Sequence, residues 1–388
     1  MDKFDKAFVH PDWSAVPTGF GCLSGKSFAI KDVFYLSGRT NTAGNPDWYN
    51  THLPAESTAP VIQRLLDEGA LLQGLTVTDE LMYSLQGENA HYGTPPHPTD
   101  PTRTPGGSSS GSASAAARGL RAFTIGTDTG GSVRIPAAYC GLYGMRPTHG
   151  SLPMDGVIPL APSFDTVGWM SASQETFIDV GRALFNSTQP AQGPFHSIKL
   201  AEDAFSLCES DVKTALSEWL STHIPGSPQR VTIAGEGLAY WAEIFRIIQG
   251  KEIWEEHGGW VTRTEPNFGP GIRERFETAA KINTEESASA ANERQRFRAN
   301  MLALLGENNL LVLPTVPGCA PKIGLTGSAA DNQRKKTMQL SCIAGLAGLP
   351  QVTLPVPLEG NLFAGLSVIA PPGRDLDLLE WLAANLDK

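Results

Sequence analysis

The sequence predicts an α/β fold, a single large domain in which helices surround one central β-sheet. Short apolar runs typical of strands alternate with amphipathic segments typical of helices along the chain, which is the pattern of α/β proteins. The 388 residues are 41% hydrophobic and 18% charged, an ordinary globular composition with ample length for a large core. The sequence has no internal repeat, low-complexity run or long linker, so nothing divides residues 1–388 into separate units.

The first part of the chain predicts a lead-in followed by strand, helix and strand. Residues 1–25 are rich in turn-forming residues, and we expect them to be irregular. Residues 27–36, SFAIKDVFYL, alternate loosely and predict a strand that contains Lys31. Residues 57–74 predict a helix, because a proline suits its first turn and apolar residues form one stripe. A short strand is expected within residues 70–80.

The next part predicts a loop, a helix and another strand. Residues 87–107 contain five prolines and four glycines, a composition typical of a loop. Residues 110–120 are alanine-rich and predict a helix, with Gly119 placed where a helix commonly ends. Residues 121–128, RAFTIGTD, predict a strand.

The second half of the chain carries weaker signals until its end. Residues 172–240 mix helix-like and strand-like pieces, and residues 241–305 are expected to be mostly helical. The remaining expected elements are strands within 309–317, 351–357 and 365–373 and an amphipathic helix over 375–388.

The balance of charge argues against several classes of partner. The chain has 30 Lys and Arg against 40 Asp and Glu, a formal net charge of −10, and no run of five basic residues. Such a composition argues against nucleic acid and anionic membranes as partners. No apolar run approaches the ~18 residues of a membrane span. The charged start, MDKFDKAFVHPDW, does not resemble a signal peptide, so we expect a soluble, cytoplasmic protein.

The cysteines give no sign of a disulfide framework or a metal site. They are scattered, none forms a C-x-x-C pair, and buried free thiols are the expected state. No metal or other cofactor is therefore expected. The five positions are Cys22, Cys140, Cys208, Cys319 and Cys342.

The stretch GTDTGGSVRIP, residues 126–136, places Ser132 directly after two glycines. Gly130 and Gly131 allow the backbone to bend so that several amide N–H groups point the same way, which forms a nest for a negative oxygen. A serine that attacks a carbonyl group creates such an oxygen. The loop could therefore supply both a nucleophile and an oxyanion hole. The alternative is a tight turn with a solvated serine.

A serine nucleophile needs a base, and Lys31 is the main candidate. It lies on an otherwise apolar predicted strand, and burial of a lysine can lower its pKa by up to about 3–5 units. The alternative role is an ion pair with Asp32, although consecutive strand residues face opposite sides. His91 and His149 are the only histidines in glycine-rich loops, and they are the candidates for a serine–histidine pair.

The stretch GGSSSGSASAAAR, residues 106–118, holds a serine 24 positions before Ser132. A serine here could relay a proton between the lysine and the nucleophile, or it could cap the amides of its own helix. The stretch also matches the G-x-S-x-G nucleophile elbow, but that motif needs a strand directly before it. The preceding HPTDPTRTP is a proline-broken loop, so we set that match aside. No G-K-[ST] follows the glycines, which argues against a phosphate-binding loop.

Together these stretches resemble the amidase signature family of serine hydrolases. The matching strings are FAIKDVF, PGGSSSGSASA, IGTDTGGSVRIPAAYCGLYGMRPTHG, GVIPLAPSFDTVG, LVLPTVPGCAP, AGLPQVTLPVP and GLSVIAPPGRD, in the family's order. The resemblance implies a mixed central sheet covered by helices on both faces. It is sharp over about residues 28–170, the catalytic signature core, and over residues 310–375, within the C-terminal strands and closing helix of 310–388. Residues 172–300, within the mostly helical variable part of 172–305, fit only in outline.

The family uses a Ser–Ser–Lys triad, and the resemblance carries its roles to this sequence. Ser132 would be the nucleophile that forms the acyl-enzyme, Ser108 the bridging serine and Lys31 the base, with no cofactor. The oxyanion donors would be the backbone amides of Thr129, Gly130, Gly131 and Ser132. Asp128 and Arg134 are expected to pair and brace the loop, and Arg134 as a clamp for a substrate carboxylate is the alternative.

Within the family the closest resemblance is to short plant-type indole-3-acetamide amidases, through GNPDW, STAPVIQRLLDEGA and GENAHYGTP. It implies a small primary amide substrate, of the arylacetamide kind, and a monomer or homodimer. Another amide specificity, or a glutaminase subunit of a tRNA-dependent amidotransferase, remains the alternative. We expect few fixed charges in the acyl pocket and Arg134 as the one cation near the nucleophile. The expected pocket walls or loop braces are Met82, Tyr83, Gln86, His91, Tyr92, Ser109 and residues 153–160 and 315–319.

Overall fold

The computed structural model describes residues 5–185, 192–224 and 226–386. Within them, eleven strands form one sheet in the order β1-β3-β2-β4-β6-β5-β10-β11-β9-β7-β8. The strands are β1 (Phe8–Ala15), β2 (Ser27–Lys31), β3 (Leu71–Thr76), β4 (Phe123–Asp128), β5 (Tyr143–Arg146), β6 (Thr166–Ser171), β7 (Ser197–Ala201), β8 (Gln229–Val231), β9 (Asn309–Pro314), β10 (Gln351–Leu358) and β11 (Leu362–Ile369).

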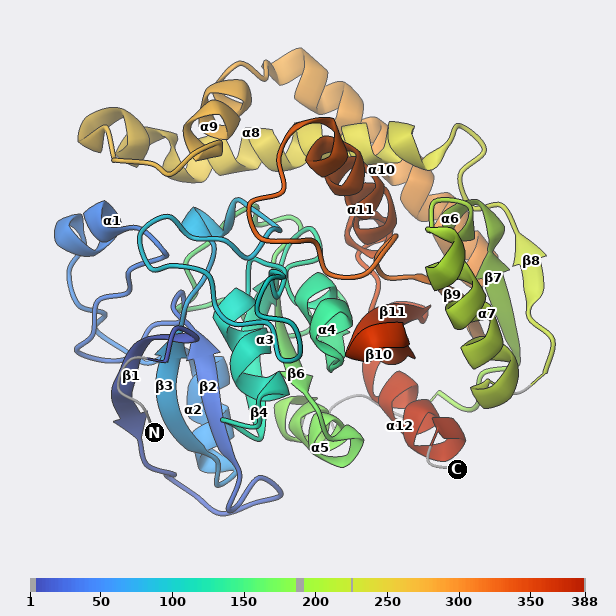
Figure 1. Cartoon of the computed structure of the whole chain (residues 1–388), viewed down its shortest axis with the longest axis horizontal. Coiled ribbons are helices and arrows are strands. Elements are labelled where there is room, and N and C mark those ends of the chain that lie inside the picture. Colours follow the sequence, from blue (N-terminus) through green and yellow to red (C-terminus); the bar gives the residue numbers. More distant parts are fainter. Residues whose placement is uncertain (1–4, 186–191, 225, 387–388) are drawn as a thin grey trace.

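Helices lie between these strands in the chain and follow the last of them (Figure 1). The α-helices are α1 (Pro46–Thr51), α2 (Pro60–Asp67), α3 (Ser110–Ala117), α4 (Arg134–Cys140), α5 (Gln174–Phe185), α6 (Glu202–Phe205), α7 (Ser210–His223), α8 (Leu238–Thr264), α9 (Ile272–Ala280), α10 (Thr284–Leu305), α11 (Gly327–Ala347) and α12 (Asp375–Leu386), and the 3₁₀ turns are η1 (Glu80–Met82) and η2 (Glu359–Asn361).

The sheet is mixed, as the sequence predicts. Strand β2 lies between β3 and β4 and is parallel to both, whereas β4, β6, β5, β10, β11 and β9 follow one another in antiparallel pairs. Strand β7 is parallel to β8 and β9 at the far end. Because β2, β3 and β4 are parallel, their carboxyl ends meet at one edge of the sheet.

Helices cover both faces of this sheet. On β2, Phe28 belongs to the main apolar cluster together with α2, while Ala29 packs with Ala115 of α3 in a separate cluster. Because successive strand residues face opposite sides, α2 and α3 lie on opposite faces. Every residue of β4 and β6 is buried, as expected for strands covered twice.

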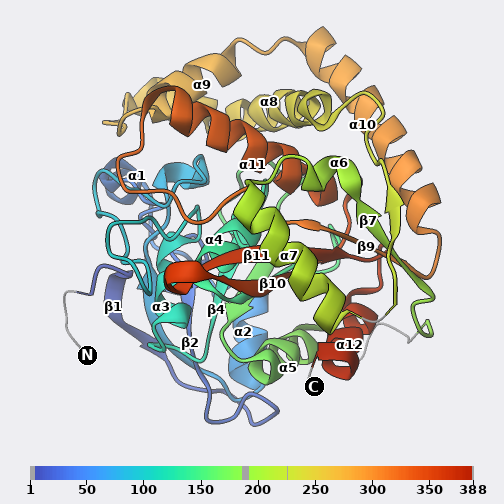
Figure 2. The ribbon, with the colours of Figure 1, turned by 45° about the vertical axis from the view of Figure 1, so that its right-hand side comes forward.

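A further layer of helices lies over the carboxyl ends of the parallel strands. Helix α8 contacts α9, α10 and α11, and together they form a layer above α3 and α4 in both views (Figures 1 and 2). The prediction of mostly helical structure over residues 241–305 is confirmed by α8, α9 and α10. Strands β7 and β8 lie within the part of the chain that the resemblance assigned as mostly helical.

One prediction for the start of the chain is wrong. Residues 1–25 were expected to be irregular, but β1 runs over Phe8–Ala15 and pairs antiparallel with β3. This strand contains Pro11, has shifts in its register and forms an edge of the sheet. Edge strands tolerate proline and bulges, so their sequences carry a weak strand signal. Among the described residues, no helix is both long and apolar enough to cross a membrane.

Candidate active site

Lys31 is the last residue of β2 and is fully buried. Its Nζ donates hydrogen bonds to Ser108 Oγ at 2.7 Å and to Thr127 Oγ1 at 2.9 Å. The neighbouring Asp32 accepts hydrogen bonds from Asn41 Nδ2 at 3.0 Å and from the Thr42 amide at 2.8 Å. The ion pair between Lys31 and Asp32, which the sequence left open, is therefore absent, and Lys31 instead contacts Ser108.

Burial lowers the pKa of Lys31 from 10.5 to about 7, although the charges of Asp79, Asp128 and Asp165 act in the opposite direction. A buried ammonium ion loses its hydration, which favours the neutral amine. A pKa of about 7 leaves roughly half of the side chains neutral at pH 7, where an unperturbed lysine would be neutral about once in 10³. Lys31 can therefore accept a proton at neutral pH.

The segment that carries Ser108 is held between β3 and the glycine loop. The Ser108 carbonyl accepts hydrogen bonds from the Asp79 amide at 3.0 Å and from Thr78 Oγ1 at 3.1 Å. The Ser109 amide donates to the Ser132 carbonyl at 3.1 Å, which ties the two serine-bearing segments together. The Ser109 side chain makes no helix-capping hydrogen bond, and it donates to the Thr127 carbonyl at 3.4 Å. Ser109 thus braces the loop.

Helix α3 follows a loop and not a strand, so the decision against a nucleophile elbow is confirmed. The predicted helix over residues 110–120 is α3 itself, and the predicted strand over 121–128 is β4. Both elements are buried, and they place Ser108 and the glycine loop at the same edge of the sheet as Lys31.

The glycine loop lies between the end of β4 and the start of α4, and Asp128 organises it. The Asp128 carboxylate accepts hydrogen bonds from the amides of Gly131, Val133 and Arg134, at 3.0, 3.0 and 3.2 Å. It also forms buried ion pairs with Arg134 at 2.7 Å and with Arg146 at 3.0 Å. Although burial raises the pKa of Asp128, these two guanidinium groups hold it well below its ordinary value.

Arg134 has its guanidinium fully occupied inside the protein. It is 0% exposed, and its Nη1 donates to the Ser341 carbonyl and to Gln351 Oε1, each at 2.8 Å, in addition to the pair with Asp128. Arg134 thus pairs with Asp128 at the ends of the loop, as the sequence predicts. The alternative, a clamp for a substrate carboxylate, is wrong because a buried guanidinium with these partners has no free face toward a ligand.

The backbone of the loop bends at Gly131, which has φ +118°, a value that favours glycine. A Cβ at this position would lie 2.6 Å from Ile135 and 2.9 Å from Ser341. The Gly131 amide is engaged by Asp128, which removes it from the expected set of free oxyanion donors. That set is thereby reduced to the amides of Thr129, Gly130 and Ser132. The Thr129 hydroxyl anchors this side of the loop by donating to Asp165 at 2.6 Å.

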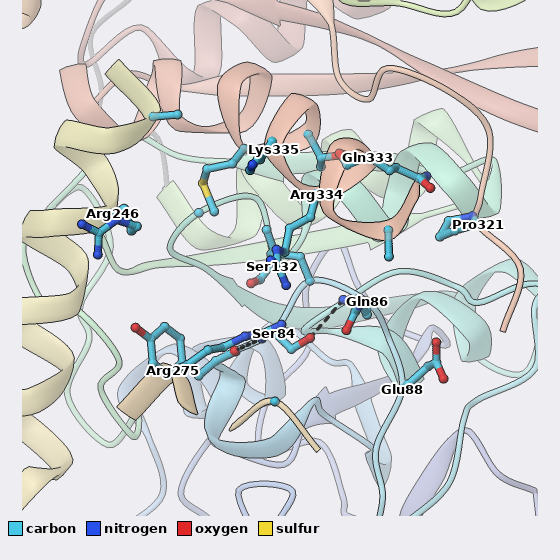
Figure 3. A pocket seen from close by; sticks show the side chains of 18 of the residues that line it. Ser84, Gln86, Glu88, Ser132, Arg246, Arg275, Pro321, Gln333, Arg334 and Lys335 are labelled. Atoms are coloured by element: carbon cyan, nitrogen blue, oxygen red, sulfur yellow. Dashed lines mark hydrogen bonds between the residues drawn. The ribbon is translucent and has the colours of Figure 1, made fainter. Parts of the chain in front are cut away.

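Ser132 and Gly130 line a cavity of about 690 Å³ (Figure 3). Four expected wall residues line it: Met82, Tyr83, Gln86 and Leu160, the last from the turn at 153–160. Ser132 itself is only 2% exposed, as expected of a nucleophile at the floor of a cavity.

Several expected wall residues are not among the lining residues. His91 Nε2 is 3.1 Å from Glu80, and the Tyr92 amide donates to Asn89 Oδ1 at 2.9 Å. Residues 315–319 are replaced in the wall by Pro321 and Lys322. These wall predictions were wrong. The loop that carries His91 and Tyr92 is bonded to Glu80 of η1 and to its own Asn89, and neither residue lines the cavity. His149 is exposed, with its Nε2 2.9 Å from the Pro162 carbonyl.

The far wall of the cavity comes from α8, α9 and α11, which sequence reasoning missed. It adds charged side chains, which contradicts the expectation of few fixed charges with Arg134 as the one cation near the nucleophile. The charged lining residues are Glu88, Glu243, Arg246, Glu274, Arg275, Lys322, Arg334 and Lys335.

Two of these arginines differ in their surroundings. Arg246 forms an ion pair with Glu243 at 2.6 Å. Arg275 donates to the Tyr83 carbonyl, and burial together with the charge of Arg334 lowers its pKa. Arg275 and Arg334 lie on opposite sides of the Ser132 side chain in Figure 3. No short motif marks these positions in the sequences of α8, α9 and α11.

The described residues contain no group of three or more His, Cys, Asp or Glu side chains arranged to hold a metal ion. The chemistry available at the site is that of its own side chains. It comprises a buried amine at neutral pH, a serine bonded to that amine, and a second serine on a loop rich in amide donors.

The whole chain is similar in sequence and in structure to known proteins. The family model described as Amidase matches residues 17–204. Amidase 1 of Arabidopsis thaliana is 40% identical over 401 residues, which cover 93% of this chain and 93% of that protein. Translocon at the outer membrane of chloroplasts 64 of Pisum sativum is 32% identical over 93% of this chain and 65% of its own length. A crystal structure of an amidase superposes with a TM-score of 0.85 at 26% identity, covering 98% of this chain and 92% of that one.

Proposed function

Since this chain belongs to the amidase family and is itself an amidase, we propose that it hydrolyses a small primary amide to a carboxylic acid and ammonia through an acyl-serine intermediate on Ser132. One observation carries this proposal. A fully buried lysine with a pKa of about 7 lies 2.7 Å from Ser108, and the Ser108–Ser109 segment is bonded to the glycine loop that bears Ser132. This supports a Ser–Ser–Lys triad of Ser132, Ser108 and Lys31.

In the proposed reaction, Ser132 Oγ attacks the amide carbon while its proton passes to Ser108 and the Ser108 proton passes to neutral Lys31. The free amides of Thr129, Gly130 and Ser132 would stabilise the oxygen that becomes negative. The proton then returns from Lys31 through Ser108 to the nitrogen that leaves as ammonia. Water hydrolyses the acyl-enzyme by the same proton path in reverse. Because the neutral amine is the active form, kcat/KM should rise with pH through about 7.

For the substrate, we propose an arylacetamide such as indole-3-acetamide. The cavity walls next to Ser132 include Met82, Tyr83, Leu160 and Met338. Apolar and aromatic surface of this kind favours a flat hydrophobic acyl group, since burial of such a group gains ~25 cal/mol per Å². The cytoplasm remains our expectation for its location.

The decisive experiment is a panel of amides scored for ammonia release. We expect kcat/KM for indole-3-acetamide or phenylacetamide to exceed that for malonamate or allophanate by at least ~10-fold, a difference of only ~1.4 kcal/mol. The two acid-bearing amides are the strongest competitors, because Arg275 and Arg334 line the cavity and would favour an anionic acyl group. The reverse order would contradict the arylacetamide assignment and leave the amidase activity standing.

A further inference from the structure

Asp79 is a buried carboxylate next to the candidate triad that the proposed reaction does not use. It is 0% exposed, and no Lys, Arg or His of the described chain lies within ion-pair distance of it. Its Oδ2 accepts a hydrogen bond from the Gly87 amide at 2.9 Å. Its Oδ1 is buried and has no hydrogen-bond partner among the described residues. Buried carboxylates are costly, so an incompletely bonded one at this position needs an explanation.

The backbone places Asp79 beside both Lys31 and Ser108. Lys31 is the register partner of Thr76 in the parallel pair of β2 and β3, and Asp79 follows Thr76 by three residues. The Asp79 amide donates to the Ser108 carbonyl at 3.0 Å. Its carboxylate packs against Gly107 so closely that a Cβ there would lie 2.2 Å from Asp79 Oδ2. The Asp79 side chain therefore touches the residue that precedes Ser108.

Electrostatics connect Asp79 to the lysine. Of the charges that act on Lys31, those of Asp79, Asp128 and Asp165, Asp79 has the largest effect, and each raises its pKa. Asp128 is already neutralised by Arg134 and Arg146. Asp165 is bonded to the Thr129 hydroxyl and to the amides of residues 160 and 161.

The reverse effect is visible on Asp79 itself. Burial raises its pKa to about 6, while the Gly87 amide, the Ser84 hydroxyl and the charges of Lys31 on β2 and Arg275 on α9 act in the opposite direction. An aspartate with this pKa is mostly ionised at neutral pH, when the triad would work. It is then a nearby negative charge without an arginine or lysine bonded to it.

We propose that Asp79 is a positioning residue for the amidase reaction, whose buried carboxylate holds the Gly107–Ser108 segment and supplies the counter-charge for the proton that Lys31 carries between attack and release of ammonia. This inference rests on the proposed Ser–Ser–Lys mechanism. No proton is transferred to Asp79 in any step. Its charge lowers the cost of forming the Lys31 ammonium ion inside the protein.

The test is the pH profile of Asp79→Asn. Asparagine keeps the shape and can still accept the Gly87 hydrogen bond, so it removes mainly the charge. We expect the rise of kcat/KM with pH to move about one unit lower, because a lysine without its counter-charge loses its proton more easily. We also expect the plateau kcat to fall ~10-fold, because that lysine is a weaker base. A lower rate with an unmoved pH profile would show a purely structural role and overturn the proposal.

Asp32→Asn is the matched control. Asp32 is equally buried and adjacent to Lys31 in the chain, and burial raises its pKa to about 7, but it is not among the charges that act on Lys31. We expect this variant to lose stability and to keep the wild-type pH profile. A shift with Asp32→Asn and none with Asp79→Asn would assign the profile to Asp32 and reject Asp79.

A second variant covers the case in which Asp79→Asn does not fold. Because the coupling between two charges is reciprocal, Lys31→Met should raise the pH at which a buried carboxyl group takes up its proton. An infrared titration of the carboxyl band in wild type and Lys31→Met measures this, and identical titrations would overturn the proposal. Failure of the mechanism itself is a separate result, seen as retained activity in Ser132→Ala.

Discussion

The floor and the wall of the cavity are built on different principles. We use the word floor for Ser132, which lines the cavity, together with three buried residues of the candidate site, Lys31, Ser108 and Asp128. Each of the four is at most 2% exposed. We call the surfaces of α8, α9 and α11 that line the cavity the far wall. There the side chains of Arg246 and Arg334 are 44% and 48% exposed.

The two regions differ in how their charged groups are stabilised. In the floor, charge is buried and therefore bonded: Asp128 has two arginines and three amides, and Lys31 has two hydroxyl acceptors. In the far wall, water can solvate the charges of Arg246 and Arg334, so these two arginines need no complete set of partners. A floor of this kind suits one fixed reaction. A solvated wall can change its charges at little cost in stability, which suits the choice of substrate.

The largest expected effect is at the nucleophile. Ser132→Ala should lower kcat by at least ~10³, because the acyl-enzyme can no longer form. A fluorophosphonate probe should label Ser132 in the wild-type enzyme, and mass spectrometry of the labelled peptide checks this. Labelling at another residue, together with an active Ser132→Ala variant, would show that Ser132 is not the nucleophile.

The rest of the relay should act with the nucleophile as one unit. Lys31→Ala and Ser108→Ala should each lower kcat by at least ~10², and the double variant should lose far less than the product of the two. His91→Ala and His149→Ala serve as controls and should stay within ~3-fold of wild type, because neither histidine lines the cavity. Complete loss of activity in a folded histidine variant would indicate a serine–histidine mechanism.

The brace of the glycine loop should matter most for stability. Asp128→Asn leaves Arg134 and Arg146 buried without a carboxylate, and we expect it to lower the free energy of unfolding by ~3–5 kcal/mol. Urea unfolding measures this. The control is Arg182→Gln, which breaks the exposed pair with Glu380 and should cost less than ~1 kcal/mol. If both variants lost the same free energy of unfolding, the buried ion pairs of Asp128 would contribute no more to stability than an exposed pair.

The smallest expected effect belongs to the far wall. Arg334→Gln should change kcat/KM for phenylacetamide by less than ~3-fold and lower kcat/KM for malonamate by ~10-fold, because only the second acyl group is anionic. Arg296→Gln is the control, since Arg296 of α10 pairs with Glu236 and with Glu293 of its own helix and does not line the cavity. Equal effects of Arg334→Gln on kcat/KM for both substrates would mean that Arg334 does not contribute to selection by acyl-group charge.

The sequence by itself determined the fold class, and it predicted the residues that we propose for the reaction. Strands β2 and β4, the loop around Ser132 and the start of α3 each carry a local signal in apolar alternation, glycine content or alanine content. Their resemblance to one family assigned these separate stretches to a single proposed active site. The pairing of Asp128 with Arg134 was also predictable, because the two residues flank the same short loop.

Only the tertiary structure decided the far wall, the direction of several side chains and the surroundings of Lys31. Helices α8, α9 and α11 span residues from 238 to 347, and their periodicity shows that one side is buried but not which element covers it. The same limit applies to His91 and Tyr92, which do not line the cavity. It applies also to Asp79, whose charge reaches Lys31 because β2 and β3 are parallel neighbours. Short stretches of sequence are enough to predict local structure and candidate reactive groups. Contacts between distant segments depend on how the whole chain packs.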